Sequence, residues 1–420
     1  MSLAARRRRR QTPRARTHAG TLLPAVLDSA TSARDAADPA SRMTDPDPDT
    51  LAADARFQLA NESEVISPSL LVFPDRVEEN LRRMIARVGS PERLRPHIKT
   101  HKLPQIVALQ ASLGVTRCKA ATIAETEMAA RSGAKDVLLA AQPVGPNPAR
   151  LVALMRAFPD VRFSTIADDA GAIAALGRAA AAANVIIDVL LDLDVGMHRT
   201  GIAPGPEAAR LYRSLVLTPG LRAGGLHAYD GHLQQAAPAE REAASAPEFA
   251  RVLALRDELL EAGLDVPRIV CGGTPSFPVH AARAEVECSP GTCVLWDYGY
   301  GRKLGDLSFR HAALLLARVI SRPGPNRLCL DLGHKAVASE MPHPRVVFPA
   351  LPEAQAVMHS EEHLVLETPR APEFAVGTAF YGIPIHICPT VALHDRVHVV
   401  RDGRVAEEWP VVARARRITA

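Results

Sequence analysis

The strongest constraint on the fold is a regular alternation of short apolar segments with helix-sized stretches. The strand-sized segments are 94–98, 118–121, 137–140, 163–165, 185–193, 221–228 and 268–271. This alternation is typical of a parallel sheet, because each parallel connection needs a crossover that a helix usually supplies. With a further short strand at 68–73, roughly eight units favour a closed (β/α)8 TIM-type barrel over an open sheet.

The pattern changes after about residue 312. The segments 314–320, 327–332, 346–348 and 396–401 read as strands separated by turns such as Asp402-Gly403. We therefore predict a smaller C-terminal β domain after the barrel. The predicted parts are a disordered tail rich in Arg, Pro and Asp (1–50), a barrel (66–310) and the β domain (311–420).

Composition excludes several classes of protein. The net charge is only +4, and residues 1–20 carry seven arginines and no acid, so no general nucleic-acid surface is expected beyond them. This arginine tract could be a targeting or nucleic-acid tail, but a disordered segment, or one upstream of a start at Met43, is favoured. No apolar run approaches the roughly 20 residues of a membrane span. Six scattered cysteines without a CxxC pair predict reduced thiols in a cytoplasmic protein.

Lysine is scarce, with six lysines among 50 basic residues. The chain uses arginine at most positions where only a positive charge is needed. A remaining lysine can therefore be required for its primary amine, which forms an imine with an aldehyde, whereas a guanidinium does not. Lys99 and Lys102 lie in the segment 95–102 (RPHIKTHK), at the end of the second predicted strand. A strand end inside a barrel shields an amine from water, so Lys99 is the predicted imine-forming residue. A basic surface loop is the alternative.

Three further polar segments follow predicted strands, where barrel enzymes collect their chemistry. The glycine-punctuated loop 194–201 carries Arg199. Tyr229 follows the strand 221–228 and could stack on a planar cofactor. After the strand 268–271, backbone N–H groups and a hydroxyl suit a phosphate, at Gly272, Gly273 and Thr274. Ordinary connecting loops and tight turns are the alternatives.

The C-terminal part holds one candidate metal pair. In the segment 384–390 (PIHICPT), His386 and Cys388 alternate, so on a strand both would point to the same face. Imidazole and thiolate suit zinc and other borderline divalent metals. Two protein ligands leave positions open for water or substrate, as a catalytic metal requires. Two buried residues of an ordinary strand are the alternative.

In this order, the segments resemble the fold-type III family of pyridoxal 5′-phosphate (PLP) enzymes that contains D-threonine aldolase and D-serine dehydratase. The resemblance covers about residues 66–415. It implies an alanine racemase-like fold and a homodimer. The segments that carry it in combination are 95–102, 194–201, 291–297, 361–363 and 386–390.

The resemblance also implies roles for single residues. Lys99 matches the lysine that holds PLP. The remaining cofactor residues are Arg199 near the ring, Tyr229 beside it, and a phosphate cradle of Gly272, Gly273 and Thr274. A divalent metal (zinc, manganese or magnesium) that binds the substrate's β-hydroxyl is held by His386 and Cys388.

The implied activity is that of a PLP- and divalent-metal-dependent lyase acting on small D-β-hydroxy-α-amino acids. Retro-aldol cleavage to glycine and an aldehyde is the first prediction, and β-elimination to a 2-oxoacid and ammonia is the alternative. Gln235 stands where some aldolases carry a histidine, and Cys388 where some carry aspartate, and both differences favour elimination. The run 391–395 is still typical of the aldolase group. An amino-acid racemase or a non-catalytic PLP-binding protein are further alternatives.

Overall fold

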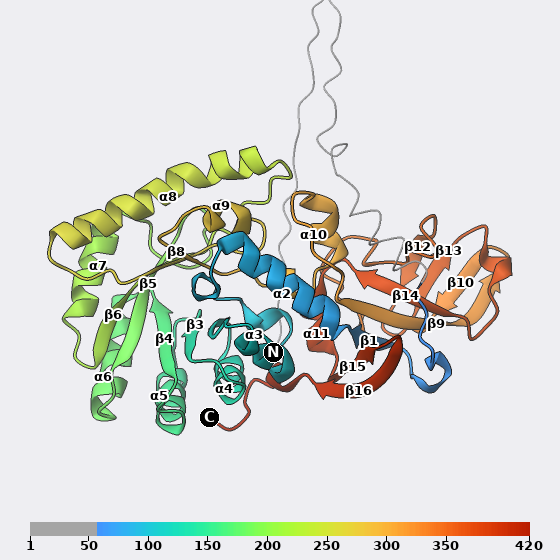
Figure 1. Cartoon of the computed structure of the whole chain (residues 1–420), viewed down its shortest axis with the longest axis horizontal. Helices are drawn as coiled ribbons and strands as arrows, with labels where there is room; N and C mark the ends of the chain where they lie inside the picture. The colour runs from blue at the N-terminus through green and yellow to red at the C-terminus, as the bar shows by residue number, and fades with distance from the viewer. Residues whose placement is uncertain (1–56) are drawn as a thin grey trace, which may run out of the picture. The chain divides into compact units, whose positions relative to one another are not determined.

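Parallel strands form the sheet of the N-terminal half, and a computed structural model describes the chain over residues 57–420. The tail predicted over 1–50 lies outside the described residues. The seven strands lie side by side in chain order (Figure 1). They are β2 (Arg117–Ala120), β3 (Asp136–Leu139), β4 (Arg162–Ala167), β5 (Ile187–Leu193), β6 (Leu221–Ala228), β7 (Ile269–Cys271) and β8 (Val286–Cys288).

An eighth segment closes this sheet into a ring. Leu94 forms a parallel bridge with Cys288 of β8, and His97 forms one with Lys119 of β2. The sequence predicted a strand over 94–98, but only these two bridges form, because Pro96 lacks the N–H that a continuous ladder needs. The chain then turns into a 3-10 helix at Ile98–Thr100. The ring confirms the predicted (β/α)8 barrel.

Helices supply the crossovers between these strands, as the alternation predicted. Several begin with proline, whose missing N–H costs nothing in a first helical turn, as at Pro104, Pro206 and Pro238. Their bounds are α3 (Pro104–Ser112), α4 (Ile123–Arg131), α5 (Asn147–Ala157), α6 (Ala170–Ala182), α7 (Pro206–Val216), α8 (Pro238–Glu261) and α9 (Phe277–Ala281).

The second sheet takes strands from both ends of the described chain. β1 (Ser69–Val72) pairs antiparallel with β9 (Ala313–Gly324) and parallel with β15 (Arg396–Arg401). The predicted C-terminal β domain is therefore present, but it includes a strand from within the range predicted for the barrel. Its other strands are β10 (Arg327–Leu330), β11 (Val346–Val347), β12 (Gln355–His359), β13 (Leu364–Glu367), β14 (Ala379–Pro384) and β16 (Arg404–Pro410). The main path is β12-β13-β10-β9-β1-β15-β16, with β14 joining β9 to β11.

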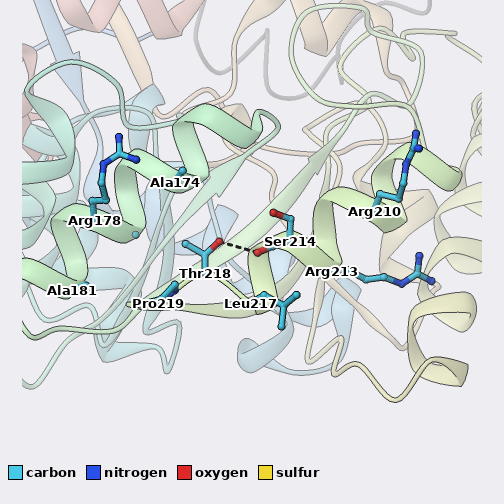
Figure 2. Close-up of a pocket in the computed structure, with 10 residues that line it drawn as sticks. Ala174, Arg178, Ala181, Arg210, Arg213, Ser214, Leu217, Thr218 and Pro219 are labelled. Atoms are coloured by element: carbon cyan, nitrogen blue, oxygen red, sulfur yellow. Dashed lines mark hydrogen bonds between the residues drawn. The ribbon is translucent and has the colours of Figure 1, made fainter.

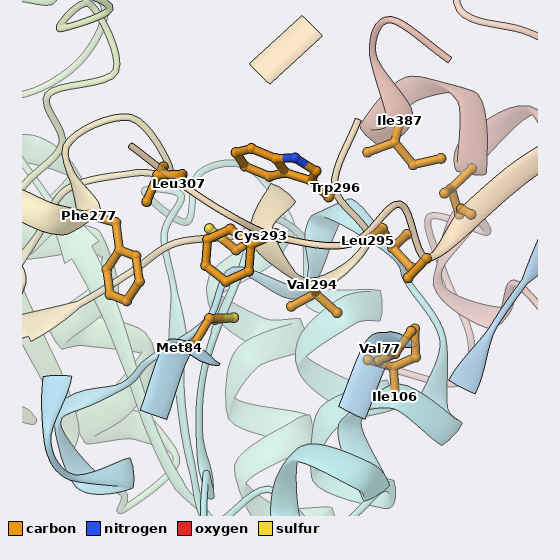
Figure 3. Packing of buried hydrophobic residues seen from close by; sticks show 14 of the residues in the cluster. Val77, Met84, Ile106, Phe277, Cys293, Val294, Leu295, Trp296, Leu307 and Ile387 are labelled. Atoms are coloured by element: carbon orange, nitrogen blue, oxygen red, sulfur yellow. The ribbon is translucent and has the colours of Figure 1, made fainter. Parts of the chain in front are cut away.

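Three helices lie where the barrel meets this second sheet: α2 (Pro74–Val88), α10 (Tyr298–Lys303) and α11 (Ile387–Leu393). One apolar cluster runs through the region (Figure 3). It joins Met84 of α2, Trp296 before α10 and Ile387 of α11, all buried. Burial of side chains from both halves in one core holds the end of the barrel and α11 in a fixed relation.

Residues 57–420 contain neither a disulfide nor a candidate membrane span. All six cysteines are free, as the scattered spacing predicted. No helix in these residues is both long and apolar enough to cross a membrane.

Asn80 of α2 ties this junction together through its buried side-chain amide. Its Nδ2 donates to the carbonyls of Val294 (3.2 Å) and Arg310 (2.8 Å), and its Oδ1 accepts from the Arg310 N–H (2.7 Å). Asn80→Leu would leave these backbone groups without partners, so we expect the free energy of unfolding to fall by about 2–4 kcal/mol.

Urea denaturation followed by circular dichroism measures this loss. Arg82→Ala is the matched control on the same helix, because the Arg82 side chain is 64% exposed and its change should stay within about 0.5 kcal/mol. Equal stability of Asn80→Leu and the wild type would contradict the assigned role of Asn80.

Candidate functional site

Lys99 lies at the end of the barrel segment that closes the ring. It sits in the 3-10 helix Ile98–Thr100, where the neighbouring residues Ile98 and Thr100 are fully buried and Lys99 itself is partly buried. The hydroxyl of Thr100 lies 3.2 Å from the Cys388 Sγ. This contact brings the residue next to the predicted lysine against one member of the predicted metal pair, across 288 positions of the sequence.

The loop that carries the metal pair is held on the barrel by Asp297. The Ile387 N–H donates to the Asp297 Oδ2 (3.1 Å), and the Gly299 N–H donates to the Ile385 carbonyl (3.2 Å). A carboxylate at the start of α11 satisfies an N–H that the helix cannot use. Asp297 is buried, and burial raises the pKa of its carboxyl group.

The predicted strand over His386 and Cys388 is wrong. β14 ends at Pro384, His386 precedes the first turn of α11, and Cys388 lies within that turn. Pro389 follows as the third helical residue, a position where proline is tolerated. The two side chains nevertheless face each other, because a hydrogen bond joins them.

His386 and Cys388 stabilise each other's charged forms, so a metal would have to displace the proton of His386 before the imidazole could bind it. Burial opposes a charged imidazole, but the hydrogen bond to Cys388 and its charge raise the pKa of His386 to about 9. Burial likewise opposes a thiolate, but the hydrogen bond to His386 lowers the pKa of Cys388 overall. Glu340 pairs with the His386 Nδ1, so the Nε2 is the ring nitrogen that could bind a metal. Within residues 57–420 no group of three or more His, Cys, Asp and Glu side chains could hold a metal ion, so His386 and Cys388 do not belong to a larger ligand set.

Arg199 and Tyr229 lie together at the mouth of the barrel. The Arg199 guanidinium carbon is 4.8 Å from the centroid of the Tyr229 ring. The loop that carries Arg199 is shaped by Asp194, whose Oδ1 accepts from the N–H groups of Gly196 (3.0 Å) and His198 (2.9 Å). Burial raises the pKa of Tyr229, so its hydroxyl stays protonated.

The predicted phosphate cradle leaves no room for side chains at its two glycines. A Cβ at Gly272, where φ is +78°, would lie 2.6 Å from the His280 ring, and one at Gly273 would lie 3.0 Å from the Tyr229 ring. Both positions therefore require glycine. The Gly272 N–H donates to the Ala228 carbonyl (3.1 Å) and the Gly273 N–H to the Ser276 hydroxyl (3.2 Å), so a phosphate bound here would share or replace these acceptors. The contact with Tyr229 also joins the cradle to the residues at the barrel mouth.

Thr274 links the cradle to the next strand end. Its Oγ1 accepts from the N–H groups of Gly291 (3.2 Å) and Thr292 (3.0 Å). The Cys293 Sγ is a further contact at 3.9 Å. With both lone pairs used, the hydroxyl hydrogen could donate to a phosphate placed here. The Thr292 hydroxyl lies 3.5 Å from the Cys388 Sγ, so contacts run from the cradle to the metal pair.

Sequence reasoning missed the buried network that braces the cradle. The Asp230 Oδ1 accepts from the Ser276 hydroxyl (2.6 Å), and its Oδ2 accepts from the His280 Nε2 (2.7 Å). Ser276 in turn accepts from the Gly273 N–H (3.2 Å). Asp230 directly follows Tyr229, and Ser276 lies just after the segment 272–274, but no local sequence pattern predicts that these two side chains are in contact. Burial alone would raise the pKa of the Asp230 carboxyl group, but the hydrogen bonds to His280 and Ser276 outweigh it, so the net pKa is lowered.

A groove of about 680 Å³ lies elsewhere, on the outer surface between α6 and α7 (Figure 2). Small residues and three arginines line it: Arg178, Arg210 and Arg213. None of the predicted site residues lies there, so the groove takes no part in the chemistry considered below.

Comparison with known proteins agrees with this arrangement. A protein-family model described as "Alanine racemase, N-terminal domain" matches residues 72–298, and one described as "Putative serine dehydratase domain" matches residues 312–400. D-threonine aldolase of Arthrobacter sp. is 31% identical over 357 residues, covering 84% of this chain and 93% of that enzyme.

D-threo-3-hydroxyaspartate dehydratase of Delftia sp. is 26% identical over 372 residues, covering 82% of this chain and 96% of that enzyme. The crystal structure of D-threonine aldolase from Filomicrobium marinum superimposes with a TM-score of 0.79 at 31% identity, covering 86% of this chain and 98% of that one. The chain therefore belongs to the alanine racemase-like, fold-type III family of PLP enzymes that contains D-threonine aldolase.

Proposed function

We propose that this protein is a PLP- and divalent-metal-dependent lyase that cleaves D-β-hydroxy-α-amino acids in the manner of D-threonine aldolase. The observation that carries the proposal is the 3.2 Å contact between Thr100 and Cys388. It sets the metal pair beside the residue next to Lys99. An amine and a metal would then act on neighbouring atoms of one small substrate.

The residues present fit PLP. Lys99 would bind the aldehyde carbon, and the phosphate would lie at the loop of Gly272 and Gly273, where neither residue has a side chain, with the Thr274 hydroxyl as a donor. Tyr229 and Arg199 would flank the ring. When bound, PLP withdraws electrons from the Cα of an attached amino acid, which eases the breaking of one of its bonds.

The residues also fit one divalent ion. The His386 Nε2 and the Cys388 Sγ would bind it, and Glu340 on the Nδ1 would fix the orientation of the imidazole. A thiolate ligand favours zinc over the harder ions manganese and magnesium. The open positions would take water and the β-hydroxyl of the substrate.

Two bond-breaking steps are compatible with these groups. In aldol cleavage, the β-hydroxyl beside His386 and Cys388 loses its proton, and the Cα–Cβ bond breaks to give glycine and an aldehyde. In elimination, the Lys99 Nζ takes the proton from Cα and hydroxide leaves toward the same pair, giving a 2-oxoacid and ammonia after hydrolysis.

The aldolase assignment has the closer relatives, since D-threonine aldolases from two sources are 31% identical to this chain. Elimination is kept as the second candidate because of Gln235. A glutamine at this position supplies no imidazole to act as a base, and its Oε1 is buried without a hydrogen-bond partner. A relative named for elimination, the D-threo-3-hydroxyaspartate dehydratase of Delftia sp., is 26% identical to this chain. From the family resemblance, we also propose that the protein is a homodimer and lies in the cytoplasm.

The assignment of Lys99 can be tested by covalent trapping. The PLP-loaded enzyme is reduced with borohydride, digested and analysed by mass spectrometry. We expect the cofactor label on Lys99, because its amine is partly exposed at the site while Lys102 is paired with Glu125. Label on another lysine, or visible absorption of Lys99→Ala equal to that of the wild type, would contradict the assignment.

The metal proposal makes a second prediction. With D-threonine as substrate, Cys388→Ala and a chelator-treated wild type should each lose at least about 100-fold in turnover, since the β-hydroxyl loses its Lewis acid. PLP absorption should persist in both samples. Chromatography of the products, glycine with acetaldehyde or 2-oxobutyrate with ammonia, separates the two candidate reactions. Unchanged turnover in both samples would rule out a catalytic metal at this pair.

A further inference from the structure

Lys119 is a second amine inside the barrel. It lies on β2 and is 1% exposed, and its strand bridges to His97, two residues before Lys99. The preceding residue, Cys118, directs its thiol toward Gln110 of the surrounding helix α3. Because side chains alternate along a strand, Lys119 points to the opposite side, into the interior of the ring.

The Lys119 amine lacks an anionic partner. Among residues 57–420, no carboxylate is within ion-pair distance of its Nζ. Two nearby acids are already engaged, Asp192 with His227 (2.6 Å) and Asp230 with Ser276 and His280. The Nζ lies over the Tyr229 ring, 5.4 Å from its centroid. Burial, and then the charge of Lys99, lower the pKa of Lys119 to about 7.

Lys99 aside, the other lysines of the chain differ from Lys119 in this respect. Lys102 pairs with Glu125, Lys335 pairs with Glu361, and Lys303 donates to Gln234 (2.9 Å). Lys135 is exposed. Burying an ammonium group without an anion lowers the stability of the fold. The chain nevertheless has a lysine here, although it uses arginine for most of its other basic residues. Such a group is expected where an anionic ligand completes its surroundings.

We propose that Lys119 binds the cofactor directly, as the counter-charge of the ionised ring oxygen of PLP. This inference rests on the proposed function. Lys99 takes the aldehyde and the cradle takes the phosphate, which leaves the ring oxygen as the remaining anion. That oxygen stands on the ring carbon next to the one that bears the aldehyde, so a cation beside Lys99 is placed to reach it. Arg199, on the same Tyr229 ring, is the other cation at this end of the site.

The test compares two ligands on two proteins. Apo wild type and Lys119→Met are titrated with PLP and with its 3-deoxy analogue, which lacks the ring oxygen. We expect wild type to bind PLP at least about tenfold more tightly than the analogue, and Lys119→Met to bind both about equally. Lys335→Met is the control, because the same substitution at an exposed, distant lysine should keep the wild-type preference.

Each outcome decides a separate claim. Equal affinity of wild type for PLP and the analogue, or a Lys119→Met variant that retains the full preference, would overturn the role of Lys119. Neither result would affect the proposed function, which in this experiment fails if wild type does not bind PLP. If Lys119→Met does not fold, the wild type alone can still overturn the role. A contact between Lys119 and the ring oxygen requires that wild type bind PLP more tightly than the analogue without this oxygen.

Discussion

The Asp297 carboxylate is the interaction on which the site depends. It accepts from the Tyr300 N–H at the start of α10 (3.0 Å) and from the Ile387 N–H at the start of α11 (3.1 Å). One buried group thus joins the last helix of the barrel region to the helix that carries the metal pair. Fixing α11 in this way brings Cys388 to the hydroxyls of Thr100 and Thr292. A small shift of α11 would separate the metal pair from Lys99.

The site is built from strand ends of the barrel plus one loop of the β domain. Strand ends supply the candidate cofactor residues in chain order. Hydrogen bonds between neighbouring loops, such as that from the Thr292 N–H to the Thr274 hydroxyl, set their spacing. Buried charge at the site is balanced by pairing, as for Asp230 with His280. The Lys119 amine has no such ion-pair partner among the described residues, and a bound anionic cofactor would provide one.

Local patterns in the sequence predicted the barrel, because the alternation of strands and helices is a property of short segments. They did not predict the pairing of β1 with β9 and β15, which joins residues more than 240 positions apart. The alternation around His386 and Cys388 was read as a strand, whereas Pro389 was the signal of a helix start. The candidate residues were found from motifs, but the contact between Thr100 and Cys388 depends on how two domains dock, which no local pattern encodes.

The central claim is that the cofactor lysine and the metal pair share one site. Anomalous X-ray diffraction from crystals loaded with PLP and zinc tests it most directly. The account predicts a metal peak bonded to the His386 Nε2 and the Cys388 Sγ, with cofactor density continuous with the Lys99 side chain. A metal bound elsewhere while this pair stays empty, or a cofactor attached to another lysine, would contradict it.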